Sequence, residues 1–374
     1  MNRFWKIFLI IFCLKLILVI LLFNGLPDLG FRGFDLPRGG DTLEYYEMSK
    51  SISKFELFNP RHFMPFGFSL IASPLFWFKA NLSLELFNLI TALINGLILL
   101  PLALTLIFLI SQRVFKRSFY SWLTVLLFIL TPYFFLIFGK LFLGSLNNLD
   151  SFIASRTLQL MWLQAGSDYL AAFLIYLAVF SFSRLRANYF YLIGLITALA
   201  FITRPQNSII IIFILFFLAY GKELKKLGRF VLGFLPLFLM QIFISFKLTG
   251  SLTSFGYSPE FNENVANISG QTSYFSPLNS LKIFSYISEV NLMIYLPLII
   301  FLAIFILGAL HLKKEDFQIF VVSVILSPLY AVLITFFEPA YRNPRYFIPV
   351  LPFFIIIFIS FIEYLIKKSY VKGT

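Results

Sequence analysis

The sequence predicts an all-α polytopic membrane protein, and three observations support this fold class. The chain is 60% hydrophobic and only 13% charged, whereas a soluble domain is about half apolar and about a quarter charged. Long runs of Ile, Leu and Phe approach the ~20 residues that a helix needs to cross the hydrocarbon core. The basic residues gather in short connections on one side, as they do in cytoplasmic loops.

The apolar runs define the predicted spans. The first run covers residues 4–24, and the mixed region 25–85 that follows is interrupted by Pro65, Gly67 and Pro74. We interpret region 25–85 as an external loop with short helices at the membrane interface. Further runs cover residues 86–111, 118–138, 168–183, 189–203, 206–220, 229–247, 291–310, 317–337 and 346–366. This pattern predicts about ten spans, and an even number places both termini on one side.

The charge distribution predicts the orientation. Loops on the side of the termini carry 16 basic and 4 acidic residues, a net charge of +12, and the opposite side carries 13 of each. Lys15, inside the first span, completes the net charge of +13. Both termini are therefore expected in the cytoplasm, and the positive charge gives no indication of a nucleic-acid partner. We treat residues 1–374 as a single membrane domain whose longer loops lie outside: 25–85, 139–167, 248–290 and 338–345.

Asp41 is the leading candidate for catalysis in the first external loop. If residues 42–55 form a helix, Tyr45, Met48, Ile52 and Phe55 share one face. Such a helix would lie at the membrane interface with Asp41 near its N-terminus. The alternative is that Asp41 serves only as a helix N-cap.

Asp168 lies where a predicted span begins on the external side. An acidic residue that enters the membrane is costly and usually has a partner or a role. The alternative is again helix capping, because the start of a helix favours a negative charge.

Basic residues on the external side are candidates for binding an anionic group. Positive charge is disfavoured on that face, so these residues need another reason to be there. They are Arg61 and His62 between two prolines, Arg204 before Pro205, and Arg342 and Arg345 before the last span. For Arg61 and His62 the alternative is headgroup contact or snorkelling, and for Arg204 it is a turn with a snorkelling side chain. For Arg342 and Arg345 the alternative is pairing with Glu338 or with lipid phosphate. No glycine-rich nucleotide loop is present, which favours a lipid-linked phosphate as the ligand.

Several motifs occur in a recognisable order over residues 4–366. They are Asp41 with Tyr45 four residues later, Arg61-His62-Phe63-Met64-Pro65, Ser167-Asp168, Arg204-Pro205 at the end of a span, and Arg345-Tyr346-Phe347-Ile348-Pro349. This ordered set resembles the membrane glycosyltransferases of the GT-C class, in particular bacterial relatives of the protein O-mannosyltransferases and of the aminoarabinose transferase that modifies lipid A. The chain departs from many relatives at Thr42, where they carry a second acid, and segment 139–165 is longer than usual.

The resemblance implies an inverting transfer of a sugar from a polyprenyl-phosphate donor to a hydroxyl of a lipid, glycan or protein acceptor. The implied setting is the external face of the bacterial inner membrane. The implied role of Asp41 is that of general base, and Asp168 would orient the partner of Asp41 or the acceptor. Glu44 and Tyr45 would contact the acceptor or the sugar. The residues implied to stabilise the leaving phosphate are Arg61, His62, Arg204, Arg342 and Arg345. No cofactor is expected. The sequence shows no metal-ligand cluster, although metal-dependent branches of the class leave a divalent metal open.

Three other functional hypotheses stay open at this point. A secondary transporter or lipid flippase would place charged residues deep in several spans, where only Lys15 lies here. A polysaccharide polymerase or ligase would also use external basic loops, usually with one large loop late in the chain, and 248–290 is a candidate. The third hypothesis is a non-catalytic assembly subunit, whose function would not require Asp41.

Overall fold

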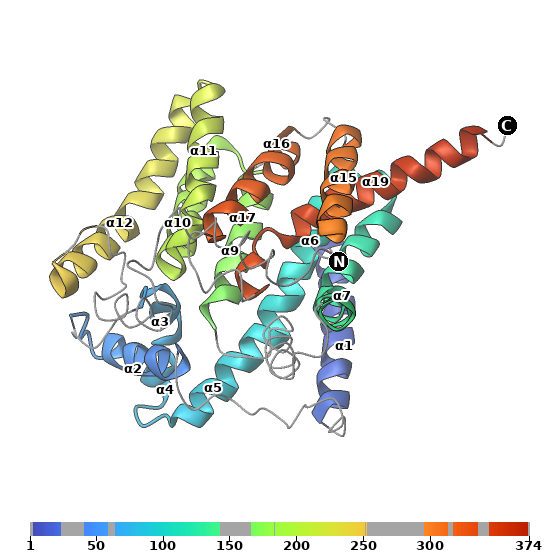
Figure 1. The fold of residues 1–374 in the computed structure, drawn as a ribbon. Helices are drawn as coiled ribbons and strands as arrows, with labels where there is room; N and C mark the ends of the chain where they lie inside the picture. The colour runs from blue at the N-terminus through green and yellow to red at the C-terminus, as the bar shows by residue number, and fades with distance from the viewer. Residues whose placement is uncertain are drawn as a thin grey trace. The chain divides into compact units, whose positions relative to one another are not determined.

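The computed structural model describes residues 3–23, 41–58, 64–142, 166–182, 184–250, 252, 295–312, 317–335 and 344–372. Within these ranges the chain is built of helices and contains no strand (Figure 1). This confirms the predicted all-α class. The contacts group the chain into two compact units, the first formed by Met1–Thr105 and Trp162–Tyr274 and the second by Leu106–Met161 and Phe275–Thr374. The single membrane domain stays a prediction.

The first unit contains most of the helices that concern the candidate site. They are α1 (Arg3–Phe23), α2 (Asp41–Ser53), α3 (Gly67–Ala72), α4 (Leu75–Phe78), α5 (Leu84–Leu93), the π-helix η2 (Ile94–Leu99), α9 (Ser167–Phe182), the 3-10 turns η3 (Ala187–Tyr189) and η4 (Pro205–Asn207), α10 (Phe190–Thr203), α11 (Ser208–Tyr220) and α12 (Leu224–Thr249). The short helices α2, α3 and α4 lie within residues 25–85, where short helices were expected.

The second unit contains the remaining helices and most of α6. They are α6 (Leu100–Val114), α7 (Ser118–Phe142), α15 (Tyr295–His311), α16 (Phe317–Val321), the π-helix η6 (Val322–Leu326), α17 (Ser327–Thr335), the 3-10 turn η7 (Pro344–Phe347) and α19 (Leu351–Lys372).

Within the described residues, each predicted apolar run coincides with a helix or a continuous helical stretch, except that turn residues 348–350 separate η7 from α19 in the run 346–366. Among the described residues, three stretches are long and apolar enough to cross a membrane: Leu84–Val114, Leu224–Leu248 and Phe317–Ile334. The number of about ten spans therefore stays a prediction.

Two glycines allow α10 and α12 to pack with their backbones in contact. A Cβ atom added to Gly194 would lie 2.1 Å from the carbonyl oxygen of Phe230, and one added to Gly233 would lie 1.9 Å from that of Tyr191. Further toward the C-terminal ends of both helices, the ring centroids of Phe201 and Phe238 lie 5.3 Å apart. Small residues at such crossings let helices approach closely where no hydrophobic driving force acts between them.

Replacing Gly233 with alanine is expected to destabilise the protein by about 1–3 kcal/mol, because the new methyl group would force the two backbones apart. The comparison is Gly228→Ala in the same helix, where an added Cβ meets nothing within 4 Å. We expect Gly228→Ala to be neutral or to stabilise by up to about 1 kcal/mol, since alanine is the better helix former. Thermal unfolding of both variants in the same detergent measures the difference, and equal midpoints would contradict this packing.

The C-terminus of α11 ends in a strained turn. Lys222 has a φ of 54°, in the left-handed region that suits glycine. Its N–H donates to the carbonyl oxygen of Ala219 (3.0 Å), and the N–H of Glu223 donates to that of Leu218 (2.9 Å). These two bonds form the Schellman motif, which usually has glycine at the left-handed position.

Lys222→Gly is therefore expected to stabilise the protein by about 1 kcal/mol. Lys222→Ala removes the same charge and keeps a Cβ atom, so it should leave stability nearly unchanged. The thermal unfolding midpoints of the two variants separate the backbone effect from the charge effect. Equal midpoints for the two would show that the backbone at residue 222 is not strained.

Helix α2 packs against other helices of the chain through its predicted apolar face. Met48 and Ile52 belong to a buried cluster with Phe66, Ile202 and Ile244. Residues of the chain itself therefore cover this face, and the position of α2 at the membrane interface stays a prediction.

Phe55, expected on the same face, is 83% exposed. Helix α2 ends at Ser53, and Phe55 takes a φ of 63° in the turn that follows. The chain therefore leaves the helical path before Phe55 can share the buried face.

Candidate functional site

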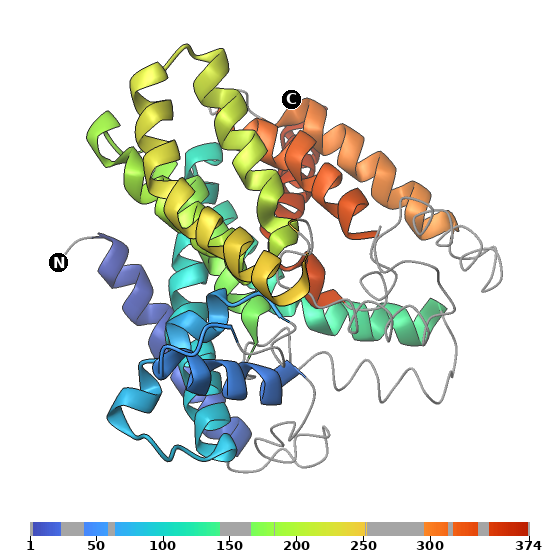
Figure 2. The same ribbon diagram turned by 90° about the vertical axis from the view of Figure 1, so that its left-hand side faces the viewer.

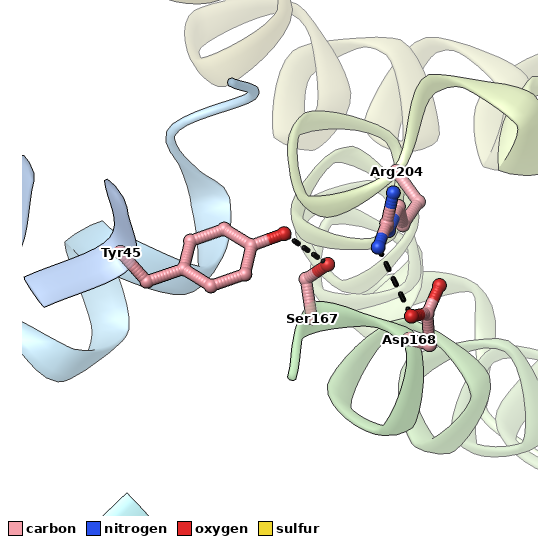
Figure 3. Close-up of polar contacts among 4 residues, drawn as sticks. All are labelled: Tyr45, Ser167, Asp168 and Arg204. Carbon is pink, nitrogen blue, oxygen red and sulfur yellow. Dashed lines mark hydrogen bonds and ion pairs between the residues drawn. The ribbon is translucent and has the colours of Figure 1, made fainter. Parts of the chain in front are cut away.

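A buried ion pair joins the start of α9 to the end of α10. Nη2 of Arg204 donates to Oδ2 of Asp168 over 3.0 Å, and both side chains are 7% exposed (Figure 3). Asp168 lies in the first turn of α9, where the free backbone N–H groups favour a negative charge. Arg204 follows α10 in an extended conformation, because Pro205 cannot continue the helix.

Asn207 stabilises this break in the chain. Its Nδ2 donates to the carbonyl oxygen of Ala200 over 3.1 Å, and the N–H of Arg204 donates to the same oxygen over 3.0 Å. The segment that leads into α11 thus caps the C-terminal end of α10. This contact holds the backbone of Arg204 in place beside Asp168.

A hydrogen bond ties α2 to the first residue of α9. The hydroxyl groups of Tyr45 and Ser167 lie 2.6 Å apart, and either one can donate (Figure 3). Tyr45 is 1% exposed, and its carbonyl oxygen accepts from Ser49 and, over 3.3 Å, from Ser69 of α3. Tyr45 therefore connects three helices directly beside Asp168.

Gly67 allows α3 to pack closely against the end of α10. A Cβ atom on Gly67 would lie 2.6 Å from both the backbone nitrogen and the hydroxyl oxygen of Thr203. Any larger residue would push α3 away from the residue that precedes Arg204. The ion pair is thus enclosed by a tight packing of α2, α3, α9 and α10.

Asp41 is the first residue of α2, one helical turn before Tyr45. Residues four apart lie on the same side of a helix, so Asp41 is placed on the side of α2 that carries Tyr45. The side chain of Asp41 lies outside the described residues. Glu44, the neighbour of Tyr45, is half-buried.

The structure therefore brings together Tyr45, Asp168 and Arg204 from the predicted set, with the backbone of Asp41 one turn away. Arg61, His62 and Arg342 lie outside the described residues, and so does the side chain of Arg345, whose backbone belongs to η7. The roles expected for these residues stay predictions.

The sequence analysis gave Ser167 no role beyond its place before Asp168 in an ordered motif, and it missed the bond of Ser167 to Tyr45. The two residues are 122 positions apart, so no local signal could have revealed it. Within the described ranges, no three His, Cys, Asp or Glu side chains gather as ligands for a metal ion.

An apolar cavity of about 120 Å³ lies close to this site, between α3, α4, η2 and α9. Phe68, Ile71, Leu75 and Leu170 contribute to its walls, and Leu170 is two residues from Asp168. Thr91 and Asn95 are its polar lining residues, so the cavity suits an alkyl group better than a charged one.

Chemically, the site combines a fixed cation, a carboxylate that orients it, and hydroxyl groups within a largely apolar surrounding. An arginine held by a buried carboxylate presents its planar N–H groups in a defined direction. Comparison with protein-family models, curated proteins and solved structures finds no match to this chain.

Proposed function

We propose that the protein transfers a sugar from a polyprenyl-phosphate donor to a hydroxyl group of an acceptor at the external face of the bacterial inner membrane. The observation that supports this most is the hydrogen bond between Tyr45 and Ser167, which connects the helix that begins at Asp41 to the Asp168–Arg204 pair. A candidate base and a fixed cation thereby belong to one packed group of helices. The ordered motifs of the sequence support the same assignment.

The proposed reaction is a single displacement. Asp41 accepts the proton of the acceptor hydroxyl while the oxygen of that hydroxyl attacks the anomeric carbon of the sugar. The bond between that carbon and the phosphate oxygen breaks, and polyprenyl phosphate leaves with the electron pair, which inverts the sugar. The phosphate needs no added proton at neutral pH, so one base is sufficient.

Arg204 would stabilise the negative charge that grows on the leaving phosphate, and Asp168 would hold the guanidinium in position. Groups fixed before the reaction lower the barrier most, since they need not reorganise when charge develops. Arg61, His62, Arg342 and Arg345 are proposed to add to this positive environment. Glu44 and Tyr45 are proposed to contact the acceptor or the sugar.

The proposal places the donor chain in the membrane and the acceptor, a lipid, glycan or protein, outside it. The apolar cavity beside Leu170 supports a ligand with an alkyl portion. The three apolar stretches of spanning length support a membrane location. Both termini are proposed to be cytoplasmic because of the charge distribution.

Transport of a lipid or solute is the second candidate. Lys15 is 7% exposed inside α1, and the Asp168–Arg204 pair is equally buried. Buried ionisable groups in membrane helices are typical of transport pathways. Transport and transfer differ in whether the bond between sugar and phosphate breaks.

The test uses the purified protein in proteoliposomes that contain polyprenyl phosphate carrying a radiolabelled sugar, with mannose, glucose and aminoarabinose in separate samples. A crude fraction of envelope lipids, glycans and proteins supplies the acceptor. We expect release of polyprenyl phosphate with one of the sugars, detected by chromatography. Movement of intact donor across the bilayer without release would instead support transport, and absence of release with all three sugars would reject this set of donors.

A further inference from the structure

Gln241 of α12 is a fully buried polar side chain whose hydrogen-bonding groups have no protein partner. The residue is 0% exposed, and within the described part of the chain neither Nε2 nor Oε1 has a hydrogen-bond partner. A carboxamide offers two donors and one acceptor, and leaving them unmet in a dry interior is unfavourable. An apolar side chain at this position would serve the fold better. The unmet carboxamide of Gln241 is the kind of group that a ligand could satisfy.

The helix packing places Gln241 close to the level of the Asp168–Arg204 pair. Helices α10 and α12 run in the same direction, since α11 returns the chain between them (Figure 2). Phe238, three residues before Gln241, contacts Phe201, and Ile244, three residues after it, shares a buried cluster with Ile202. Gln241 is therefore level with the last turn of α10, which Arg204 follows directly.

A second buried polar residue continues this side of α12. Ser245 follows Gln241 by one helical turn, and it is also 0% exposed. The stretch around them is otherwise apolar, with Leu237, Met240 and Leu248 packed against the same cluster. Two polar residues one turn apart thus form a narrow polar stripe beside the end of α10.

We propose that Gln241 is a specificity-determining residue that recognises a hydroxyl group of the substrate. A phosphate is better matched by arginine and an alkyl chain by an apolar wall, whereas a hydroxyl group both donates and accepts and so pairs fully with a carboxamide. The inference rests on the proposed function, in which the hydroxyl-bearing part of the donor is its sugar. Gln241 would then contact the sugar, and the basic residues would contact the phosphate.

The experiment compares wild type and Gln241→Leu in two measurements. Thermal unfolding without ligand should show an equal or higher midpoint for the variant, because an unpartnered amide has been removed. Binding is then measured in detergent with two probes, polyprenyl phosphate and polyprenyl-phosphate-linked sugar. We expect Gln241→Leu to bind the glycosylated probe about ten-fold more weakly and the bare polyprenyl phosphate as tightly as wild type.

Gln318→Leu is the matched control. Gln318, in α16 of the second unit, also has a buried Oε1 without a hydrogen-bond partner in the described part of the chain. Its replacement removes the same type of group from a helix of the other compact unit. We expect Gln318→Leu to bind both probes as wild type does.

The outcomes separate this inference from the proposed function. Equal binding of both probes by wild type and Gln241→Leu overturns the inference alone, and so does an equal loss of both. A strongly lowered unfolding midpoint for both Gln241→Leu and Gln241→Met would show that the amide supports the fold, which also overturns it. If wild type binds neither probe, the proposed function fails and the inference fails with it.

Discussion

Asparagine in place of Asp41 is expected to lower sugar transfer by at least about a hundred-fold, because a positioned general base contributes about 10²–10⁴ to the rate. Asparagine matches aspartate in size and keeps a side-chain oxygen that can accept a hydrogen bond at the start of α2, so the variant loses only the basic carboxylate. The rate of polyprenyl phosphate release in proteoliposomes measures the effect. Glu47→Gln is the control, since Glu47 is an exposed carboxylate of the same helix and has no assigned role in the site.

Near wild-type transfer by the Asp41→Asn variant would remove Asp41 from catalysis and leave it as a capping residue. Asp41→Ala would then lower stability by about 1 kcal/mol and leave the rate per folded molecule unchanged. The two substitutions together decide between the roles that the sequence left open for this residue.

Breaking the Asp168–Arg204 pair from one side is expected to cost about 3–5 kcal/mol of stability. Asp168→Leu leaves the guanidinium buried without its carboxylate, and Arg204→Met leaves the carboxylate without its cation. Neither charge can return to water easily, because both side chains are 7% exposed. Unfolding by heat or denaturant in the same detergent measures the loss.

Two comparisons make this prediction specific. The double variant Asp168→Leu/Arg204→Met buries no charge and should recover most of the lost stability, as apolar replacements of buried ion pairs often do. Lys226→Met breaks the more exposed pair with Glu223 in the same unit, at 2.6 Å, and should cost less than about 1 kcal/mol. A double variant as unstable as the single ones would show that the two charges do not act as a pair.

The sequence predicted the helices well because their signal is local. Apolar runs such as 118–138 and 189–203 became α7 (Ser118–Phe142) and α10 (Phe190–Thr203), with bounds that differ by a few residues. Polar residues and proline mark such ends within a few positions along the chain. Whether each helix crosses a bilayer depends on length and surroundings, so the span count does not follow from the helices alone.

The site was predictable only in part. The cost of burying a charge indicated that Asp168 would have a partner, but not that Arg204 would supply it from 36 residues away. The contact from Tyr45 to Ser167 spans 122 residues and depends on how α2, α3 and α9 pack. For α2, the sequence identified the apolar face but not its neighbour, because apolar residues suit a lipid and a protein surface equally well.

The bond between Tyr45 and Ser167 also has a mechanical consequence. A ligand that displaces α2 must either break this bond or carry the first turn of α9, with Asp168, along with it. Occupancy near Asp41 and the direction of the Arg204 guanidinium would then be linked through this pair of hydroxyl groups, in addition to the packing of Met48 and Ile52 against Ile202. If the proposed transfer uses two substrates, such a linkage would favour one order of binding, and Tyr45→Phe, which removes one hydroxyl, is expected to weaken that preference.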